Sequence, residues 1–529
     1  MVGCQRNWPG KAISVVRACA TCISLVLLLG GAGCDSGIGS IFARPGGPTE
    51  PLTAAEVETI ISQAAASLAS DTLVIAVTDR EGNVLGVFRK PEAPDRVTLR
   101  LAGRATNLDA NEAAVSLART AAFFSNDQAP LSTTTVRFIS REHFPPTFSG
   151  DGAVTGVKNT PSGALWDIEN TNKGCELSTD YNADKAVAPP RSIDGTGPGV
   201  GIATVPGGVP LYKMGKLVGG VGVTGAPPNL AEFAAFSGSA GFRPIVPAPG
   251  EVFIDGVRLP FVEQSSRPLG TGFGEFTGDY VPIRDLSNPT VMIDGPQGSL
   301  RSYVPEGWLV GPKGSAELTE GQVRSIIENA VFEANQTRAV IRLPAGTRAK
   351  FVIAVTALDG EVLGLFRMAD ATVFSIDVAV TKARNVTYFS GTDRNAADLP
   401  GVPLGTAVTN RTLRFGSQPF FPPGIADSLP GPFVNLRLTN QENPCTQGSQ
   451  PLGPNQSGIV FFPGSAPLYR LGFVLVGGLG VSGDGVDQDD YVTAAGILGY
   501  EAAPFLRADR ISIRGVTLPY IKFPRAPEE

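Results

Sequence analysis

The apolar positions of the chain form two glycine-rich runs that follow the same plan. Residues 205–225 have the sequence VPGGVPLYKMGKLVGGVGVTG, and residues 462–483 have the sequence FPGSAPLYRLGFVLVGGLGVSG. Each run contains a Pro-Gly turn, a second turn at Gly215 or Gly472, and an apolar stretch that ends in Val-Thr-Gly or Val-Ser-Gly. A short apolar stretch between glycine turns is typical of a buried strand. We therefore expect a buried β-hairpin at each of these two places.

The elements that precede these hairpins repeat as well. Apolar residues at three-and-four spacing predict an amphipathic helix over about residues 53–69 and another that begins at Thr319. Thr53 with Glu56, and Thr319 with Gln322, have the spacing of a capping box. A repeat unit of about 200 residues indicates tandem domains and not a solenoid. The sequence also predicts opening hairpins at residues 74–89 and 352–367, and second helices at about residues 109–124 and 375–389.

These repeats divide the chain into parts. We expect a first domain at residues 51–263, an irregular linker at residues 264–317 and a second domain at residues 318–524. Each domain carries a long insertion rich in Asn, Pro, Thr and Gly, at about residues 125–204 and 391–459. Loops of this length are usually functional or disordered. Five aromatic residues of the linker favour packing of the linker against a domain: Phe273, Phe276, Tyr280, Tyr303 and Trp308.

The first residues have the pattern of an export signal. Basic residues precede the apolar stretch at residues 23–29, and small residues follow it before Cys34. This pattern predicts a signal peptide at residues 1–33. A cysteine directly after small residues resembles the bacterial lipobox, so lipidation of Cys34 is expected, the alternative being a plain signal peptide with an incidental cysteine. Residues 34–50 are rich in Gly, Ser and Pro and are predicted to be a flexible tether.

The repeated motifs resemble a known family. The Pro-Gly turn, Pro-Leu and Val-Gly-Gly-x-Gly-Val strand are similar to those of the haem-binding family typified by HbpS and GlcG, which includes the C-terminal domain of some cobalamin adenosyltransferases. The VIAVTDREGNVLGVFR and VIAVTALDGEVLGLFR hairpins and the TKARNVTYF helix strengthen the resemblance. It implies an α+β fold of two profilin-like GlcG-type domains, each an antiparallel sheet covered by helices. It further implies haem or another tetrapyrrole as ligand, and domains that pair as an internal pseudo-dimer.

Composition narrows the function classes. The formal net charge of −6 and the pI near 5.2 give no basic surface for nucleic acid. The sequence has one histidine, His143, so one chain cannot build a site with several histidine ligands. His143 lies in a Pro-rich loop without a nearby nucleophile elbow, and Phe420 takes its place in the second copy. A structural role is the favoured interpretation of His143, and a haem-ligand or acid–base role is the alternative.

Three cationic residues are further candidates for binding a ligand. Arg89 and Arg367 end the same strand in the two copies, where they would bind an anionic group such as a propionate or be solvated. Lys382 stands where the resembling family has a lysine, although the first copy has Leu117 there. Cys175 and Cys445, one in each insertion, would form a disulfide between the domains or remain two buried thiols.

The sequence therefore predicts an exported, lipid-anchored protein of the cell envelope that binds a small ligand, with haem or another tetrapyrrole suggested by the resemblance. The alternative is a non-catalytic structural or protein-interaction lipoprotein. An enzyme is the least favoured class, because the sequence contains no recognisable catalytic constellation.

Overall fold

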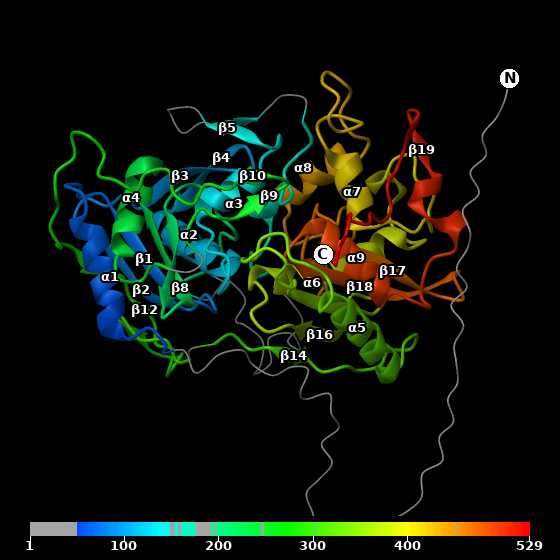
Figure 1. The fold of residues 1–529 in the computed structure, drawn as a ribbon, viewed down its shortest axis with the longest axis horizontal. Coiled ribbons are helices and arrows are strands. Elements are labelled where there is room, and N and C mark those ends of the chain that lie inside the picture. The colour runs from blue at the N-terminus through cyan, green and yellow to red at the C-terminus, as the bar shows by residue number, and fades with distance from the viewer. Residues whose placement is uncertain are drawn as a thin grey trace, which may run out of the picture. The chain divides into compact units, whose positions relative to one another are not determined.

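The computed structural model describes residues 50–148, 154–156, 160–175, 192–194, 197–244, 248–301, 303–451 and 453–528 (Figure 1). The predicted signal peptide, Cys34 and all of the predicted tether except Glu50 lie outside these ranges. Within them, no helix combines the length and the apolar character needed to cross a membrane.

The first half of the described chain runs from Glu50 to Arg301. Its helices and strands follow the predicted order, with additional short strands. They are α1 (Ala54–Ala66), β1 (Val74–Asp79), β2 (Val84–Arg89), β3 (Arg96–Leu101), β4 (Arg104–Asp109), α2 (Ala110–Phe124), α3 (Thr133–Ile139), β5 (Pro146–Phe148), β6 (Val154–Gly156), β7 (Gly208–Lys213), β8 (Lys216–Thr224), α4 (Pro228–Gly238), β9 (Phe253–Ile254), β10 (Val257–Arg258), β11 (Asp279–Tyr280), β12 (Ile283–Arg284) and β13 (Met292–Ile293).

The second half runs from Tyr303 to Glu528 and repeats the main elements. They are β14 (Gly307–Val310), α5 (Glu320–Ala334), β15 (Phe351–Thr356), β16 (Val362–Arg367), α6 (Phe374–Ser390), α7 (Asn410–Ser417), α8 (Val434–Glu442), β17 (Ser465–Arg470), β18 (Val474–Gly483), α9 (Val486–Gly496), β19 (Ser512–Ile513) and β20 (Val516–Thr517).

The two halves contain sheets of the same topology. Each has five strands, in the order β11-β2-β1-β8-β7 in the first half and β14-β16-β15-β18-β17 in the second. All neighbouring strands in both sheets are antiparallel. The mixed α+β class and the antiparallel sheets agree with the sequence prediction.

Helices cover both faces of each sheet because successive strand residues point to opposite sides. In β1, Ile75 and Val77 belong to the same apolar cluster as α1 residues, whereas Val74 and Ala76 pack with α2 (Figure 1). Helix α2 lies directly on β8, and α6 lies directly on β18. Glycine permits this approach, since a Cβ at Gly222 would collide with the backbone of α2.

The predicted capping boxes are confirmed at the start of α1 and α5, where Thr53 bonds Glu56 and Thr319 bonds Gln322. The insertions contain more regular structure than the sequence suggested. Helices α3 and α7 each begin with a capping box of their own, and α8 follows in the second insertion. These helices are short, so their apolar period was too brief to identify in sequence.

The predicted irregular linker at residues 264–317 supplies an edge strand to each sheet. Strand β11 pairs with β2, and β14 pairs with β16. The linker therefore packs against the sheets as predicted, although three of its five aromatic residues stay partly or largely exposed. Phe273, Phe276 and Tyr303 are 80%, 41% and 46% exposed.

The two halves share an interface within the described chain. Phe124 of α2 stacks on Phe374 of α6 with ring centroids 4.0 Å apart. Arg80 of the first half pairs with Asp370 of the second half. The buried guanidinium of Arg342, in the second half, pairs with the same Asp370 at 2.7 Å and with Asp484. One apolar cluster includes residues from both halves.

Candidate functional site

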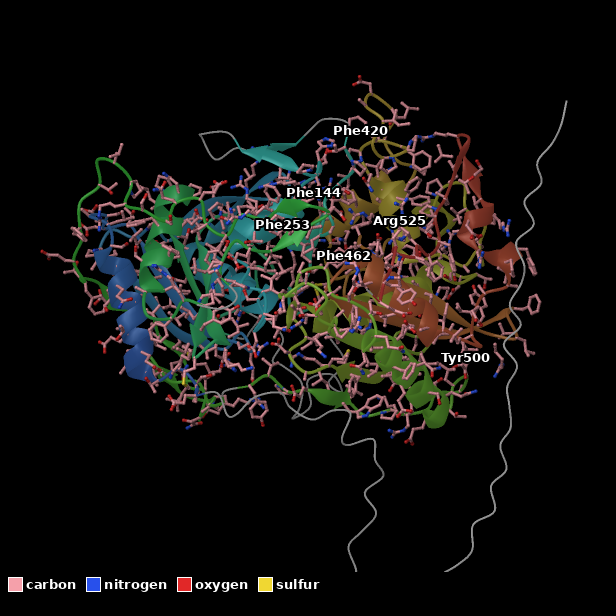
Figure 2. All side chains as sticks on the ribbon, viewed as in Figure 1. Phe144, Phe253, Phe420, Phe462, Tyr500 and Arg525 are labelled. Carbon is pink, nitrogen blue, oxygen red and sulfur yellow. A yellow bond between two sulfur atoms is a disulfide. The ribbon has the colours of Figure 1, made fainter. Side chains whose placement is uncertain are left out.

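A cavity of about 700 Å³ lies between the two halves. Its lining comes from the first half at α2, α3 and the β9–β10 turn, and from the second half at the end of β18, the start of α9 and residues 522–525. Phe253 and Phe462 mark this junction, and Arg525 lies on the segment beyond β20 (Figure 2). Pockets of roughly 300–1,000 Å³ are typical small-molecule sites.

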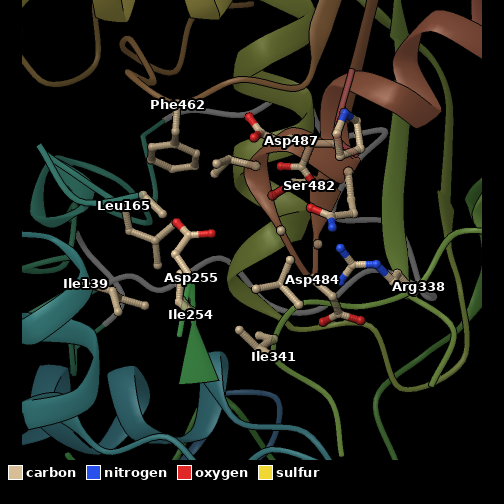
Figure 3. Close-up of a pocket in the computed structure, with 18 of the residues that line it drawn as sticks. Ile139, Leu165, Ile254, Asp255, Arg338, Ile341, Phe462, Ser482, Asp484 and Asp487 are labelled. Atoms are coloured by element: carbon tan, nitrogen blue, oxygen red, sulfur yellow. The ribbon is translucent and has the colours of Figure 1, made fainter. Parts of the chain in front are cut away.

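The first half gives the cavity a mainly apolar wall, to which Asp255 of the β9–β10 turn adds one exposed carboxylate (Figure 3). Ile139, Leu165 and Ile254 lie on one side in Figure 3, facing Ser482, Asp484 and Arg338 on the other. Ile254 is held by the short β9–β10 hairpin, and Ile139 ends α3. The remaining apolar lining residues are Phe124, Leu131, Ala164, Phe253, Val340, Ile341, Phe374, Phe462, Val486, Phe523 and Pro524.

The carboxylates that α9 and the end of β18 bring to the cavity already have cationic partners. Asp484 pairs with Arg342 and accepts a 2.7 Å hydrogen bond from the backbone N of Lys350. Asp487 pairs with both Arg411 and Lys522 at 2.6 Å. These carboxylates therefore contribute little uncompensated negative charge to the cavity.

Two arginines supply positive charge at the cavity. Arg338 donates from Nε to the carbonyl oxygen of Ala526 at 3.0 Å, a neutral partner that leaves its charge uncompensated. Arg525 is exposed and forms no hydrogen bond or ion pair with the part of the chain that the structure describes. The cavity thus combines an apolar wall with guanidinium groups that suit a carboxylate.

Lys382 lies beside this cavity, behind one of its lining residues. Its Nζ donates to Asp489 Oδ2 at 2.9 Å and to the carbonyl oxygen of Val481 at 2.7 Å. Its ammonium lies 5.2 Å from the ring centroid of Phe462. Burial, only partly opposed by Asp489, lowers the pKa of Lys382. Burial also raises the pKa of Asp489 to about 7, although Lys382 opposes the shift.

The positions that Lys382 and Asp489 occupy in the second half are taken by apolar residues in the first half. A Cβ added at Gly464 would meet Asp489 and Lys382, whereas a Cβ added at the corresponding Gly207 would meet Leu117 and Ala231. Both members of the ion pair therefore differ together between the halves. Such a paired exchange avoids leaving one buried charge without its partner, which is the costly arrangement.

The other cationic candidates are not brought together with Lys382. Arg367 is 1% exposed and donates to the carbonyl oxygens of Val304, Pro305 and Ala371. Burial lowers its pKa to about 9. Because these carbonyls occupy its guanidinium, Arg367 is neither solvated nor directed at the cavity. Arg89 pairs with Asp95 at 2.9 Å and donates to Asn111 at 3.1 Å, and it also does not line the cavity.

His143 is not among the residues that line the cavity. Its Nδ1 is 2.8 Å from the carbonyl oxygen of Thr160, and its ring stacks on Phe420 at a centroid distance of 6.0 Å. Phe420 is the residue that takes the place of His143 in the second copy. The two corresponding loops therefore meet through these rings. Among the described residues, no group of three or more His, Cys, Asp or Glu side chains could hold a metal ion.

The structure joins Cys175 of the first half to Cys445 of the second in a disulfide, with a Cα–Cα distance of 5.4 Å. Nearby polar contacts also cross between the halves. Asp167 Oδ1 accepts from Arg437 at 3.0 Å, and the backbone N of Asn172 donates to Asp377 at 2.8 Å. This disulfide fixes the two insertions to each other.

Sequence reasoning did not find most of the cavity residues. Asp489, Phe462, Arg338 and Arg525 were not among the candidates, and only Lys382 pointed to the region. The available signal was the difference between the copies, since Lys382 and Asp489 correspond to Leu117 and Ala231.

Comparisons with known proteins identify a family for part of the second half. Residues 318–498 match the family model described as "Haem degrading protein HbpS-like", so the second half contains an HbpS-like domain. No curated protein matches the chain.

Three solved structures are similar to parts of the chain. The crystal structure of a PduOC:heme complex is 21% identical over 35% of this chain and 95% of that chain, with a TM-score of 0.23. The Klebsiella pneumoniae protein ORFY is 18% identical over 34% and 88%, with a TM-score of 0.22. A double mutant of Streptomyces reticuli HbpS is 20% identical over 38% and 93%, with a TM-score of 0.20.

Proposed function

We propose that this protein binds an amphipathic small ligand, haem or another tetrapyrrole, in the cavity between its two halves. The observation that carries the proposal is the combination of an apolar wall, formed by residues such as Ile139 and Ile254, with the guanidinium groups of Arg338 and Arg525. Tetrapyrroles have an apolar ring and carboxylate substituents, which these two surfaces complement. The HbpS-like match of residues 318–498 supports a haem-related ligand.

The lining residues fit the macrocycle better than they fit its iron. The chain has one histidine, and His143 contacts Thr160 and Phe420 instead of lining the cavity. A bound haem would supply an iron centre for redox chemistry. The residues of this chain would hold the ring by apolar contact and its carboxylates by Arg338 and Arg525. The proposed activity is therefore binding, with no chemical step assigned to the protein.

The proposal includes two tandem domains of this family that pair as an internal pseudo-dimer. The equal strand order of the two sheets supports it, as do the contacts between corresponding elements, such as Phe124 of α2 on Phe374 of α6. Ligand pockets are common at the junction between two domains, and the cavity of this protein lies at such a junction.

The proposal also includes export and lipid attachment at Cys34. The disulfide between Cys175 and Cys445 supports export, because such bonds persist in oxidising compartments. Two or more acyl chains would give stable membrane attachment. A Cys34→Ala protein should leave the membrane fraction and fail to label with a fatty-acid probe. Retention of that variant in the membrane fraction would contradict the lipid anchor.

A titration with hemin tests the ligand. The full chain should shift the Soret band from its position in free hemin, and other tetrapyrroles should compete for the same site. A spectrum that stays identical to that of free hemin at all protein concentrations would contradict the proposal. That result would favour the alternative, a non-catalytic envelope protein that acts through protein contacts.

A further inference from the structure

The charged groups of the cavity between the halves are unevenly distributed. The aspartates at the end of β18 and the start of α9 each have a cationic partner, and Lys522 pairs with Asp487 at 2.6 Å. Arg338, Arg525 and Asp255 also line the cavity, and none of these three forms an ion pair with the part of the chain that the structure describes. Their positions therefore decide where unpaired charge faces a ligand.

The two arginines lie at the same edge of the cavity. Arg338 Nε donates to the carbonyl oxygen of Ala526 at 3.0 Å, and Arg525 directly precedes Ala526 in the chain. Glu528 lies on the same segment, but its side chain accepts from Tyr491 Oη at 3.5 Å and pairs with no cation of the described chain. This edge is therefore suited to the carboxylates of a ligand.

Asp255 lies on the opposite side of the cavity. Figure 3 shows its carboxylate beside Leu165 and Ile254, across the cavity from Arg338. Asp255 is exposed, and no side chain in the described ranges forms a hydrogen bond or ion pair with it. A ligand carboxylate on this side would lose water to the apolar wall and would be repelled by Asp255.

The turn that holds Asp255 does not require a carboxylate. Asp255 and Gly256 have φ angles of 50° and 79°, and Arg514 and Gly515 of the corresponding β19–β20 turn have φ angles of 52° and 79°. Arg514 does not line the cavity and donates to the carbonyl oxygen of Pro430 at 2.8 Å. Because the same turn forms with a side chain of either sign, the backbone geometry does not fix the charge at position 255.

We propose that Asp255 determines the specificity of this cavity, which selects tetrapyrroles whose carboxylates lie along one edge of the ring. This inference rests on the proposed function. The carboxylate edge of the ring binds Arg338 and Arg525, and the apolar edge lies against Ile139 and Ile254. A tetrapyrrole with further carboxylates on its second edge binds less tightly, because one of its charged groups must face Asp255.

Protoporphyrin IX and coproporphyrin III are matched probes for this specificity. Protoporphyrin IX has propionates on one edge only, and coproporphyrin III has further propionates in place of the vinyl groups of the opposite edge. Titration of the full disulfide-bonded chain, followed by porphyrin absorbance, should give a dissociation constant at least about tenfold larger for coproporphyrin III. Asp255→Asn should lower the constant for coproporphyrin III by about fivefold and leave that for protoporphyrin IX within about twofold. Asparagine also tolerates the positive φ of this turn.

Asp294→Asn is the matched control, because Asp294 is another exposed aspartate that precedes a glycine and it does not line the cavity. It should change the affinity for neither porphyrin. Equal dissociation constants for the two porphyrins, or equal effects of Asp255→Asn and Asp294→Asn, would overturn this inference and leave the proposed function intact. Binding of neither porphyrin would overturn the proposed function and this inference together.

Discussion

The Lys382→Leu substitution removes the ammonium group that Asp489 binds at 2.9 Å, in a place where the two side chains are 0% and 3% exposed. Asp489 would then be a buried carboxylate without its cation. Removing one partner of a buried ion pair costs about 3–5 kcal/mol of folding free energy. The double substitution Lys382→Leu with Asp489→Ala reproduces Leu117 and Ala231 of the first half. We expect it to stay within about 2 kcal/mol of the original protein, because apolar replacement of both partners is often neutral.

The cost of the single substitution should depend on pH. Burial, opposed by Lys382, raises the pKa of Asp489 from 3.8 to about 7. Loss of Lys382 raises it further. A carboxyl with a raised folded-state pKa contributes stability below its unfolded pKa and loses that stability as the pH rises through the folded value. The deficit of Lys382→Leu should therefore be small near pH ~5 and clearly larger near pH ~8, above the folded pKa of about 7 in the original protein.

Urea unfolding of the full chain, followed by circular dichroism at both pH values, measures these differences. The double variant is the matched control, since it has lost the same lysine. A double variant that is as unstable as Lys382→Leu would refute the reasoning. A deficit that does not change between the two pH values would refute the assignment of the cost to the ionised Asp489.

Three further predictions concern the contacts between the halves. Arg342→Met should lower stability by about 3–5 kcal/mol in urea unfolding, because the buried Asp484 loses its cation while Asp370 keeps Arg80; an unchanged midpoint would contradict this. Replacing Cys175 and Cys445 by Ser should cost about 2–5 kcal/mol, and non-reducing peptide mapping of the original protein should find these cysteines linked, not as free thiols. Burial raises the pKa of Asp377 from 3.8 to about 6. Its stabilising effect is present below pH 3.8 and lost as the pH rises through about 6. Asp377→Asn should therefore stabilise the protein by about 3 kcal/mol near pH ~8 and have no effect near pH ~3; equal thermal shifts at both pH values would contradict this.

Much of the fold could be predicted because its signals are local. The glycine-bounded hairpins and the capped amphipathic helices depend on residues a few positions apart, and the repeat showed that each element occurs twice. The β3–β4 hairpin and the edge strands β11 and β14 were missed. Two-residue strands such as β11 have no period of their own and exist because they pair with a sheet edge.

The candidate site was less predictable because its contacts are distant in sequence. Lys382 bonds Asp489, which lies 107 positions further along. Arg367 was expected at a surface or ligand site, yet the segment containing Val304 and Pro305 crosses it and accepts its hydrogen bonds. Residue type alone could not show which cations would be occupied by backbone carbonyls and which would face a cavity.

The affinity of the full chain for protoporphyrin IX, compared with hemin, tests the central proposal most directly. Because the cavity lining contains no histidine, the account predicts that both bind with dissociation constants within about tenfold of each other. Ile341→Trp, which fills the cavity, should weaken both, whereas Leu404→Trp at an exposed position should weaken neither. Hemin binding that needs His143 and excludes protoporphyrin IX, or binding of both that is unaffected by Ile341→Trp, would contradict the account.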